Sequence, residues 1–225
     1  MPNVAVFFFV LVAIAVVVGI IYSFYAAQQR RNELSAWAQL RGLRFRSDQV
    51  SGMDAAYPAF DCLNEGRARY GYNRMDGEWS GRRFLGFDYH YRTGSGKNTH
   101  DYTFSAIILE SDVPLKPLFI RREGLGDRMA TFLGFEDINF ESAEFSREFY
   151  VKSPDRKWAY DVLHQRAMEF LLAMPRFTIQ FDEQRVMVYR DSTFATGDFE
   201  NAAKVAQGLL DGLPSYVQQP QAAGT

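Results

Sequence analysis

Residues 82–110 read RRFLGFDYHYRTGSGKNTHDYTFSAIILE, with apolar and polar side chains alternating on both sides of a glycine-rich centre. The period of two is typical of strands that bury one face. It predicts two long strands, 82–92 and 99–110, joined by a loop at 93–98. The expected shared face consists of Phe87, Tyr89, Tyr91, Tyr102, Phe104, Ala106 and Ile108.

Further strands and helices are expected on either side of this hairpin. The other expected strands are 67–75 (followed by a turn at Asp76-Gly77), 118–121, 145–151, 177–181 and 186–190, and the expected helices are 127–132, 155–173 and 199–210. Strands and helices come in blocks and do not alternate strictly. The sequence therefore predicts an α+β fold with a mainly antiparallel sheet and packed helices.

The N-terminal stretch is apolar, and its first charged side chain is Arg30. Residues 4–27 are long enough to span a bilayer, since about 20 apolar residues suffice. A cleaved signal peptide fits less well, because no Lys or Arg precedes the run and Phe24 or Tyr25 would occupy the −3 position of the cleavage site. We expect a transmembrane anchor over residues 1–27 that contacts the lipid bilayer through residues 4–27.

Basic residues follow the apolar stretch and predict its orientation. They are Arg30, Arg31, Arg41, Arg44 and Arg46, against the acidic Glu33 and Asp48. Positive flanks stay in the cytoplasm, so we expect a single-pass protein of the cell inner membrane with a cytoplasmic C-terminal domain. The same arginines are candidates for contact with anionic lipid headgroups.

The chain after the anchor divides into three expected parts. Residues 28–43 have helical spacing, with Leu34, Trp37 and Leu40 on a repeating face and Gly42 as the stop, which predicts a juxtamembrane helical stalk. Residues 44–215 are expected to form a cytoplasmic α+β domain. Polar residues 216–225 are expected to be a disordered tail.

Composition excludes several classes of protein. The formal net charge is −2, which gives no basic excess for binding nucleic acid. Cys62 is the single cysteine, which excludes an intramolecular disulfide and a thiolate metal cluster. The 20 Phe and 12 Tyr provide ample material for a core, so the domain is expected to be folded.

The loop at 93–99 has some features of an ATPase phosphate loop. Tyr91 stands where that motif needs glycine, Asn98 replaces the Ser or Thr that follows the lysine, and the next residues alternate as a strand. We therefore expect an exposed hairpin loop and no nucleotide cofactor.

Asp88, His90 and Asp101 form the candidate polar cluster. If the hairpin pairs Arg92 with Thr99, His90 lies opposite Asp101, with Asp88 on the same face. Such side chains could hold a divalent cation or share protons, or they could simply form a solvated polar face. No complete catalytic motif is present, so no catalytic, cofactor-binding or metal-binding residue is assigned.

Residues 140–151 read FESAEFSREFYV and are followed by Asp155 and the run AYDVL at 159–163. This pattern resembles the second half of certain bacterial membrane-associated proteins of unknown function, in which a strand leads into a helix and then a short hairpin. The resemblance covers about residues 137–191. It implies a membrane-associated domain without assigned activity, and it brings no catalytic residue with it. Those relatives have two membrane segments, whereas one is expected here.

Three functions follow as hypotheses. The leading one is an adaptor or assembly module whose cytoplasmic domain binds a membrane or cytoplasmic protein. The second is a membrane-tethered, metal-dependent hydrolase that uses Asp88, His90 and Asp101. The third is a module that binds anionic lipid through the arginines after the anchor.

Overall fold

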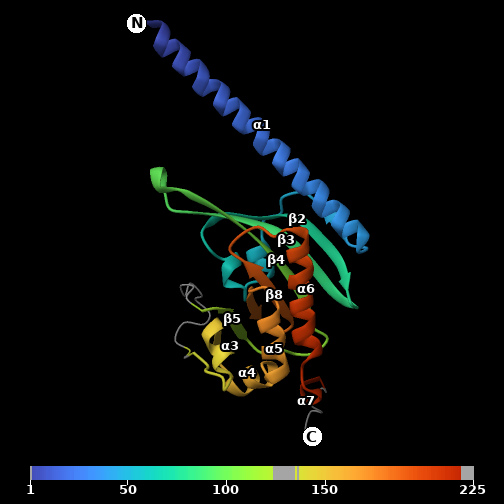
Figure 1. Ribbon diagram of the computed structural model, residues 1–225. Coiled ribbons are helices and arrows are strands. Elements are labelled where there is room, and N and C mark those ends of the chain that lie inside the picture. The colour runs from blue at the N-terminus through green and yellow to red at the C-terminus, as the bar shows by residue number, and fades with distance from the viewer. Residues whose placement is uncertain (1, 124–134, 136, 219–225) are drawn as a thin grey trace.

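The computed structural model describes residues 2–123, 135 and 137–218 (Figure 1). Its centre is an eight-stranded sheet with the order β1-β2-β3-β4-β8-β7-β5-β6, in which every neighbouring pair is antiparallel. The strands are β1 (Arg44–Arg46), β2 (Arg67–Trp79), β3 (Arg82–Thr93), β4 (His100–Glu110), β5 (Leu118–Arg122), β6 (Phe149–Lys152), β7 (Thr178–Phe181) and β8 (Arg185–Arg190). This architecture confirms the predicted α+β fold.

Helices pack on the sheet, and the longest of them, α1, forms the N-terminal part of the chain. They are α1 (Pro2–Leu40), α2 (Met53–Ala56), α3 (Ala143–Glu148), α4 (Arg156–Val162), α5 (Gln165–Ala173), α6 (Thr196–Asp211) and α7 (Ser215–Gln218), with 3-10 turns η1 (Asp61–Leu63) and η2 (Gly96–Asn98). The N-terminal part of α1 stands away from the rest of the molecule, and the C-terminal end of the described chain lies at the opposite end (Figure 1).

Within the body of the domain, both faces of the sheet carry apolar residues that pack on other segments. On one face, Phe87 pairs with Ala106, Tyr89 with Phe104 and Tyr91 with Tyr102, which confirms the shared face predicted for the central hairpin. This face packs on the segment that carries α2 and η1, through Met53, Phe60 and Leu63 among others. The other face packs on α3 to α6 and on the C-terminal part of α1.

Helix α1 is continuous from the apolar stretch into the core. It is the one helix within the described ranges that is long and apolar enough to cross a membrane, judged by length and composition. The helix ends at Leu40 and Gly42 follows in the left-handed region (φ 68°), as expected. Leu34, Trp37 and Ala38 are buried, whereas Leu40 is 83% exposed, because positions i, i+3 and i+4 share a helix face and i+6 does not.

The predicted turn at Asp76-Gly77 is wrong. Strand β2 runs through both residues, and the hairpin turns at Ser80 and Gly81, whose φ values of 51° and 81° are those of a two-residue type I′ turn. Glycine at position 77 allows Leu43 to pack against the backbone of β2, since a Cβ there would lie 2.9 Å from Leu43 Cδ2.

Three other segments differ from expectation or cannot be compared. Residues 145–151 are not one strand, because the Ser142 side chain caps helix α3 by accepting from the Phe145 N–H, and only Phe149–Lys152 is extended. The helix expected at 155–173 is two helices, α4 and α5, broken at Leu163 and His164. The helix expected at 127–132 lies outside the described residues.

The remaining expectations agree more closely. Strands β5, β7 and β8 and helix α6 lie where the sequence predicts them, within three residues at each end. The expected tail at 216–225 overlaps α7 in its first three residues, and residues 219–225 lie outside the described part of the chain.

Candidate functional site

Asp88 lies in the middle of β3, and its side chain has no exposed surface. Four donors from three different elements reach its two carboxylate oxygens. Arg30 donates from Nε to Oδ2 at 2.9 Å and from Nη2 to Oδ1 at 2.7 Å. Asn73 Nδ2 donates to Oδ2 at 2.9 Å, and the Ser105 hydroxyl donates to Oδ1 at 2.5 Å. The carboxylate thus has a two-pronged guanidinium partner and two neutral donors.

Arg30 connects helix α1 to more than this one strand. Its Nη1 donates to the backbone carbonyl of Phe194 at 2.8 Å, in the segment between β8 and α6. The Phe194 N–H donates in turn to Ser105 Oγ at 2.8 Å. We call Arg30, Asn73, Asp88, Ser105 and Phe194 the junction, because they join α1, β2, β3, β4 and the segment that precedes α6.

An irregularity in β2 brings Asn73 into the junction. The pairing of β2 with β3 shifts between Tyr72 and Met75, and Asn73 adopts a left-handed conformation with φ 48°. Such a bulge changes the direction of a side chain relative to the regular alternation. Asparagine tolerates this conformation better than most residues, and here the bulge turns its amide toward Asp88.

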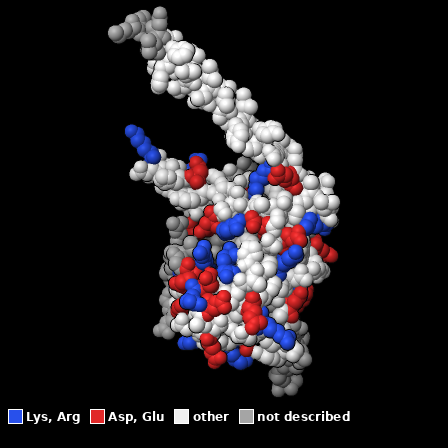
Figure 2. Space-filling view, in the orientation of Figure 1, with Lys and Arg blue, Asp and Glu red and all other residues white. Residues whose placement is uncertain are grey.

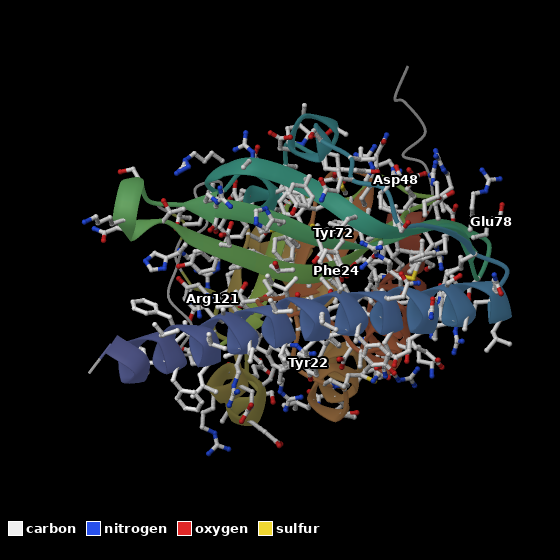
Figure 3. The ribbon with its side chains drawn as sticks, turned by 90° about the horizontal axis from the view of Figure 1, so that it is seen from above. Tyr22, Phe24, Asp48, Tyr72, Glu78 and Arg121 are labelled. Carbon is white, nitrogen blue, oxygen red and sulfur yellow. The ribbon has the colours of Figure 1, made fainter. Side chains whose placement is uncertain are left out.

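The charge of the junction affects its neighbour Tyr72, which lies opposite Asp88 in the β2–β3 pair. Burial of the hydroxyl and, to a lesser extent, the negative charge of Asp88 raise the pKa of Tyr72 to about 12. Tyr72 is therefore a neutral hydrogen-bonding group at physiological pH and not a base. Figure 3 shows Tyr72 on the strands, with α1 running alongside them.

His90 and Asp101 meet, although in a different register from the one predicted. Arg92 pairs with Asp101 and His90 with Thr103, so the assumed pairing of Arg92 with Thr99 is wrong by two residues. Asp101 Oδ1 still lies 2.9 Å from His90 Nε2, across the diagonal, and it accepts from Arg92 Nε at 2.7 Å. These two partners, Arg92 first, lower the pKa of Asp101.

The predicted cluster of Asp88, His90 and Asp101 does not assemble. Asp88 is enclosed by Arg30, Asn73 and Ser105, while His90 stacks on Tyr70 with 4.6 Å between ring centroids and bonds to Asp101. Within the described ranges, no three His, Cys, Asp or Glu residues are placed to hold a metal ion. A cation would have to displace the guanidinium of Arg30 to reach Asp88.

The arginines after the apolar stretch also have partners within the protein. Besides the pair of Arg30 with Asp88, Arg41 pairs with Glu200 on α6 and lies over the Trp37 ring, and Arg46 pairs with Asp76. These contacts connect the end of α1 and β1 to the domain. They leave less of this charge for lipid headgroups than the sequence indicates.

The junction is not among the sites predicted from the sequence, although the sequence carries one signal for it. Arg30 is the first charge after a long apolar stretch, and it falls one turn before Leu34 on the face that Trp37 and Ala38 continue. An arginine on the buried face of a helix needs an acidic partner. Nothing in the sequence alone identifies that partner as Asp88, which is 58 positions away.

No protein-family model and no curated protein matches this chain. Among solved structures, the chain is similar to the crystal structure of the mycobacterial trehalose monomycolate transport factor A, TtfA. The TM-score is 0.61 at 13% sequence identity, and the match covers 82% of this chain and 96% of that chain. At this identity the likeness shows a shared fold.

Proposed function

We propose that this protein is a membrane-anchored adaptor. In this proposal, α1 crosses the inner membrane once, the α+β domain lies at its cytoplasmic face, and the domain binds a membrane protein as an accessory of a transport complex. The basic flank after the apolar stretch supports the orientation. The transport factor that shares the fold supports the accessory role.

The junction is the observation that carries this proposal. A bidentate ion pair with the buried Asp88 joins α1 to the sheet. In addition, Trp37 stacks on Trp79 with 6.3 Å between ring centroids, and its ring centroid lies 5.9 Å from that of Phe199. A flexible linker would leave the orientation of the domain free. A rigid connection fixes which face of the domain points along the membrane, and an adaptor needs that fixed orientation.

Site-specific photocrosslinking in the native membrane tests the proposal. A photoreactive phenylalanine analogue would replace, one at a time, the exposed residues Leu40, Tyr102, Tyr160 and Tyr216 of the full-length protein. We expect one or two neighbouring positions to capture the same membrane protein in stoichiometric yield. The Arg30→Ala variant should lower that yield, whereas Lys204→Ala, an exposed change on α6, should not. Recovery of the protein alone from every position would contradict the adaptor role.

Orientation has a separate test. Ser215 is exposed at the end of the domain away from α1, and Cys62 is buried with a raised thiol pKa, so a Ser215→Cys variant is labelled selectively. An impermeant thiol reagent should label it in inside-out vesicles and not in right-side-out vesicles. The reverse pattern would place the domain outside the cytoplasm.

A further inference from the structure

The hairpin formed by β3, η2 and β4 extends beyond the body of the domain as an arm (Figures 1 and 2). Its tip and the N-terminal end of α1 lie on the same side of the molecule in both ribbon views (Figures 1 and 3). The arm and α1 therefore leave the junction in the same general direction, with Arg30 and Asp88 as their common starting point.

The reach of the arm can be compared with that of the helix. Strand β3 continues from Asp88 to Thr93, which is about 17 Å at 3.3 Å per residue. The same rise along α1 corresponds to about 11 residues and leads from Arg30 back to about Gly19, well inside the apolar stretch. If α1 stood along the membrane normal, the tip of the arm would lie at the depth of the lipid chains.

The tip is too polar to enter that depth. Gly94 to Asn98 are exposed, and a loop with unsatisfied backbone groups is not tolerated in hydrocarbon. A tilt of α1 would bring the tip to the headgroup layer instead. The length of the apolar stretch is independent support for a tilt. Residues 4–27 rise about 36 Å along the helix axis, which exceeds the ~30 Å of hydrocarbon, and a helix longer than the hydrocarbon layer tilts.

The chemistry of the tip suits phosphate headgroups. Lys97 is exposed at the end of the loop, Arg92 flanks it, and Arg67 holds it by donating from Nη2 to the Gly94 carbonyl at 2.9 Å. Asp101 offsets one of these three positive charges. Tyr102 is 39% exposed and stacks on Tyr91, as amphipathic rings do at the membrane interface.

We propose that the tip of this arm, residues 93–99, rests on the anionic headgroups of the same bilayer that α1 enters, and that this second contact sets the tilt of α1. The proposal rests on the membrane insertion of α1 and does not require a protein partner. It assigns the lipid contact to the arm and not to the arginines after the apolar stretch, three of which pair with acids of the domain.

Depth-dependent quenching in nanodiscs tests this proposal on the full-length protein. An environment-sensitive fluorophore would be attached in separate variants to Ser95→Cys on the arm, Ala15→Cys in α1 and Ser215→Cys at the far end, with the buried Cys62 left unlabelled. Nanodiscs would contain phosphatidylcholine with or without phosphatidylglycerol and a lipid that carries a quencher near the headgroup. We expect quenching at Ser95→Cys, and little at Ser215→Cys.

Charge variants test the headgroup contact. In anionic nanodiscs, Lys97→Glu should shift the contact equilibrium at Ser95→Cys by about fivefold or more. The matched Lys157→Glu change, on α4 at the far end, should leave it unchanged. The proposal would be overturned if quenching at Ser95→Cys were no greater than at Ser215→Cys. It would also be overturned if quenching at Ser95→Cys changed neither when anionic lipid is removed nor in the Lys97→Glu variant. Blue-shifted emission of the fluorophore at Ala15→Cys, the middle of the apolar stretch, would show in either case that membrane insertion itself is intact.

Discussion

Asp88 carries a negative charge at a position with no exposed surface, and removing such a charge from water costs several kcal/mol. The fork of Arg30 and the two neutral donors offset that cost, so the net gain from the complete set is small. The penalty for an incomplete set is large, because one charge then stays buried without a partner. The junction therefore favours one docking geometry of α1 over all others.

Replacing Arg30 by alanine should destabilise the protein by about 3 kcal/mol or more, since Asp88 would remain buried and unpaired. Adding Asp88→Asn to that variant should recover part of the loss, because the neutral amide can bond to Asn73 and Ser105. Denaturant unfolding of the full-length protein in micelles, followed by tryptophan fluorescence, measures the free energy of unfolding.

Arg30→Lys is the control for this prediction. It keeps the positive charge but loses the two-pronged contact. Its free energy of unfolding should therefore lie between those of the wild type and Arg30→Ala. A stability of Arg30→Ala within ~0.5 kcal/mol of the wild type would show that the junction does not hold the helix.

At the scale of the element, helix α4 depends on its N-cap residue, Asp155. The Asp155 carboxylate accepts from Lys116 Nζ at 2.6 Å and caps the helix by accepting from the Trp158 N–H at 3.0 Å. These contacts, Lys116 first, lower the pKa of Asp155 below its usual value. A carboxylate with a lowered folded pKa adds stability above its unfolded pKa, and this stability is lost as pH falls through the folded pKa.

The Asp155→Asn variant isolates this dependence, because asparagine caps a helix equally well and does not titrate. Between about pH 5 and pH 3, the thermal midpoint of the wild type should fall more steeply than that of the variant. Parallel curves would mean that neither Lys116 nor the cap favours the charged form of Asp155.

The tip of the arm makes a second prediction at this scale. Gly94 and Gly96 both have positive φ, but a Cβ at Gly94 would lie 2.0 Å from the Asn98 carbonyl oxygen, whereas a Cβ at Gly96 meets nothing within 4 Å. Gly96→Ala should cost about 1 kcal/mol locally through backbone strain alone. Gly94→Ala should cost more, because the loop must rebuild.

Hydrogen exchange of the Asn98 amide, which donates to the Ser95 carbonyl at 3.1 Å, measures this difference. Exchange should be fastest in Gly94→Ala. Equal rates in the two variants would show that the loop conformation does not depend on the close approach at Gly94.

At the scale of the whole molecule, α1 belongs to two environments. Its apolar N-terminal part is exposed, while Leu34, Trp37 and Ala38 join the core with Met75, Phe84 and the residues of α6. The stalk predicted at 28–43 is thus helical to Leu40 and packed on the domain. The limits of the predicted domains, 1–27, 28–43, 44–215 and 216–225, stay a prediction.

Two truncations test which part of α1 the domain needs for its stability. A chain of residues 28–225 keeps the junction and should unfold cooperatively. A chain of residues 44–225 lacks Arg30 and Trp37. Its free energy of unfolding should be lower by more than about 5 kcal/mol, which is comparable to the whole stability of a small domain. Thermal unfolding and binding of a hydrophobic dye measure both. Cooperative unfolding of 44–225 at an unchanged midpoint would show that α1 is only a tether.

The candidate site shows where sequence reasoning stops. Alternation placed Asp88 and His90 on the correct face, because the period of a strand is local. It could not place Asp101, since the register of the hairpin depends on how the 93–99 loop closes, and a shift of two residues keeps every side chain on its face. The bulge that turns Asn73 toward Asp88 leaves no mark in the alternation of 67–75.

The sequence by itself determined the α+β class, the central hairpin with its aromatic face, and an apolar N-terminal helix that ends before Gly42. Each of these follows from spacings of a few residues, which the backbone geometry dictates. Only the tertiary structure decided that α1 docks on the sheet, that Asp88 receives Arg30, and that Asp88, His90 and Asp101 stay apart. Those outcomes depend on contacts between residues up to 164 positions apart. Such contacts are selected by the burial and pairing of charges in the assembled core, and no local pattern encodes them.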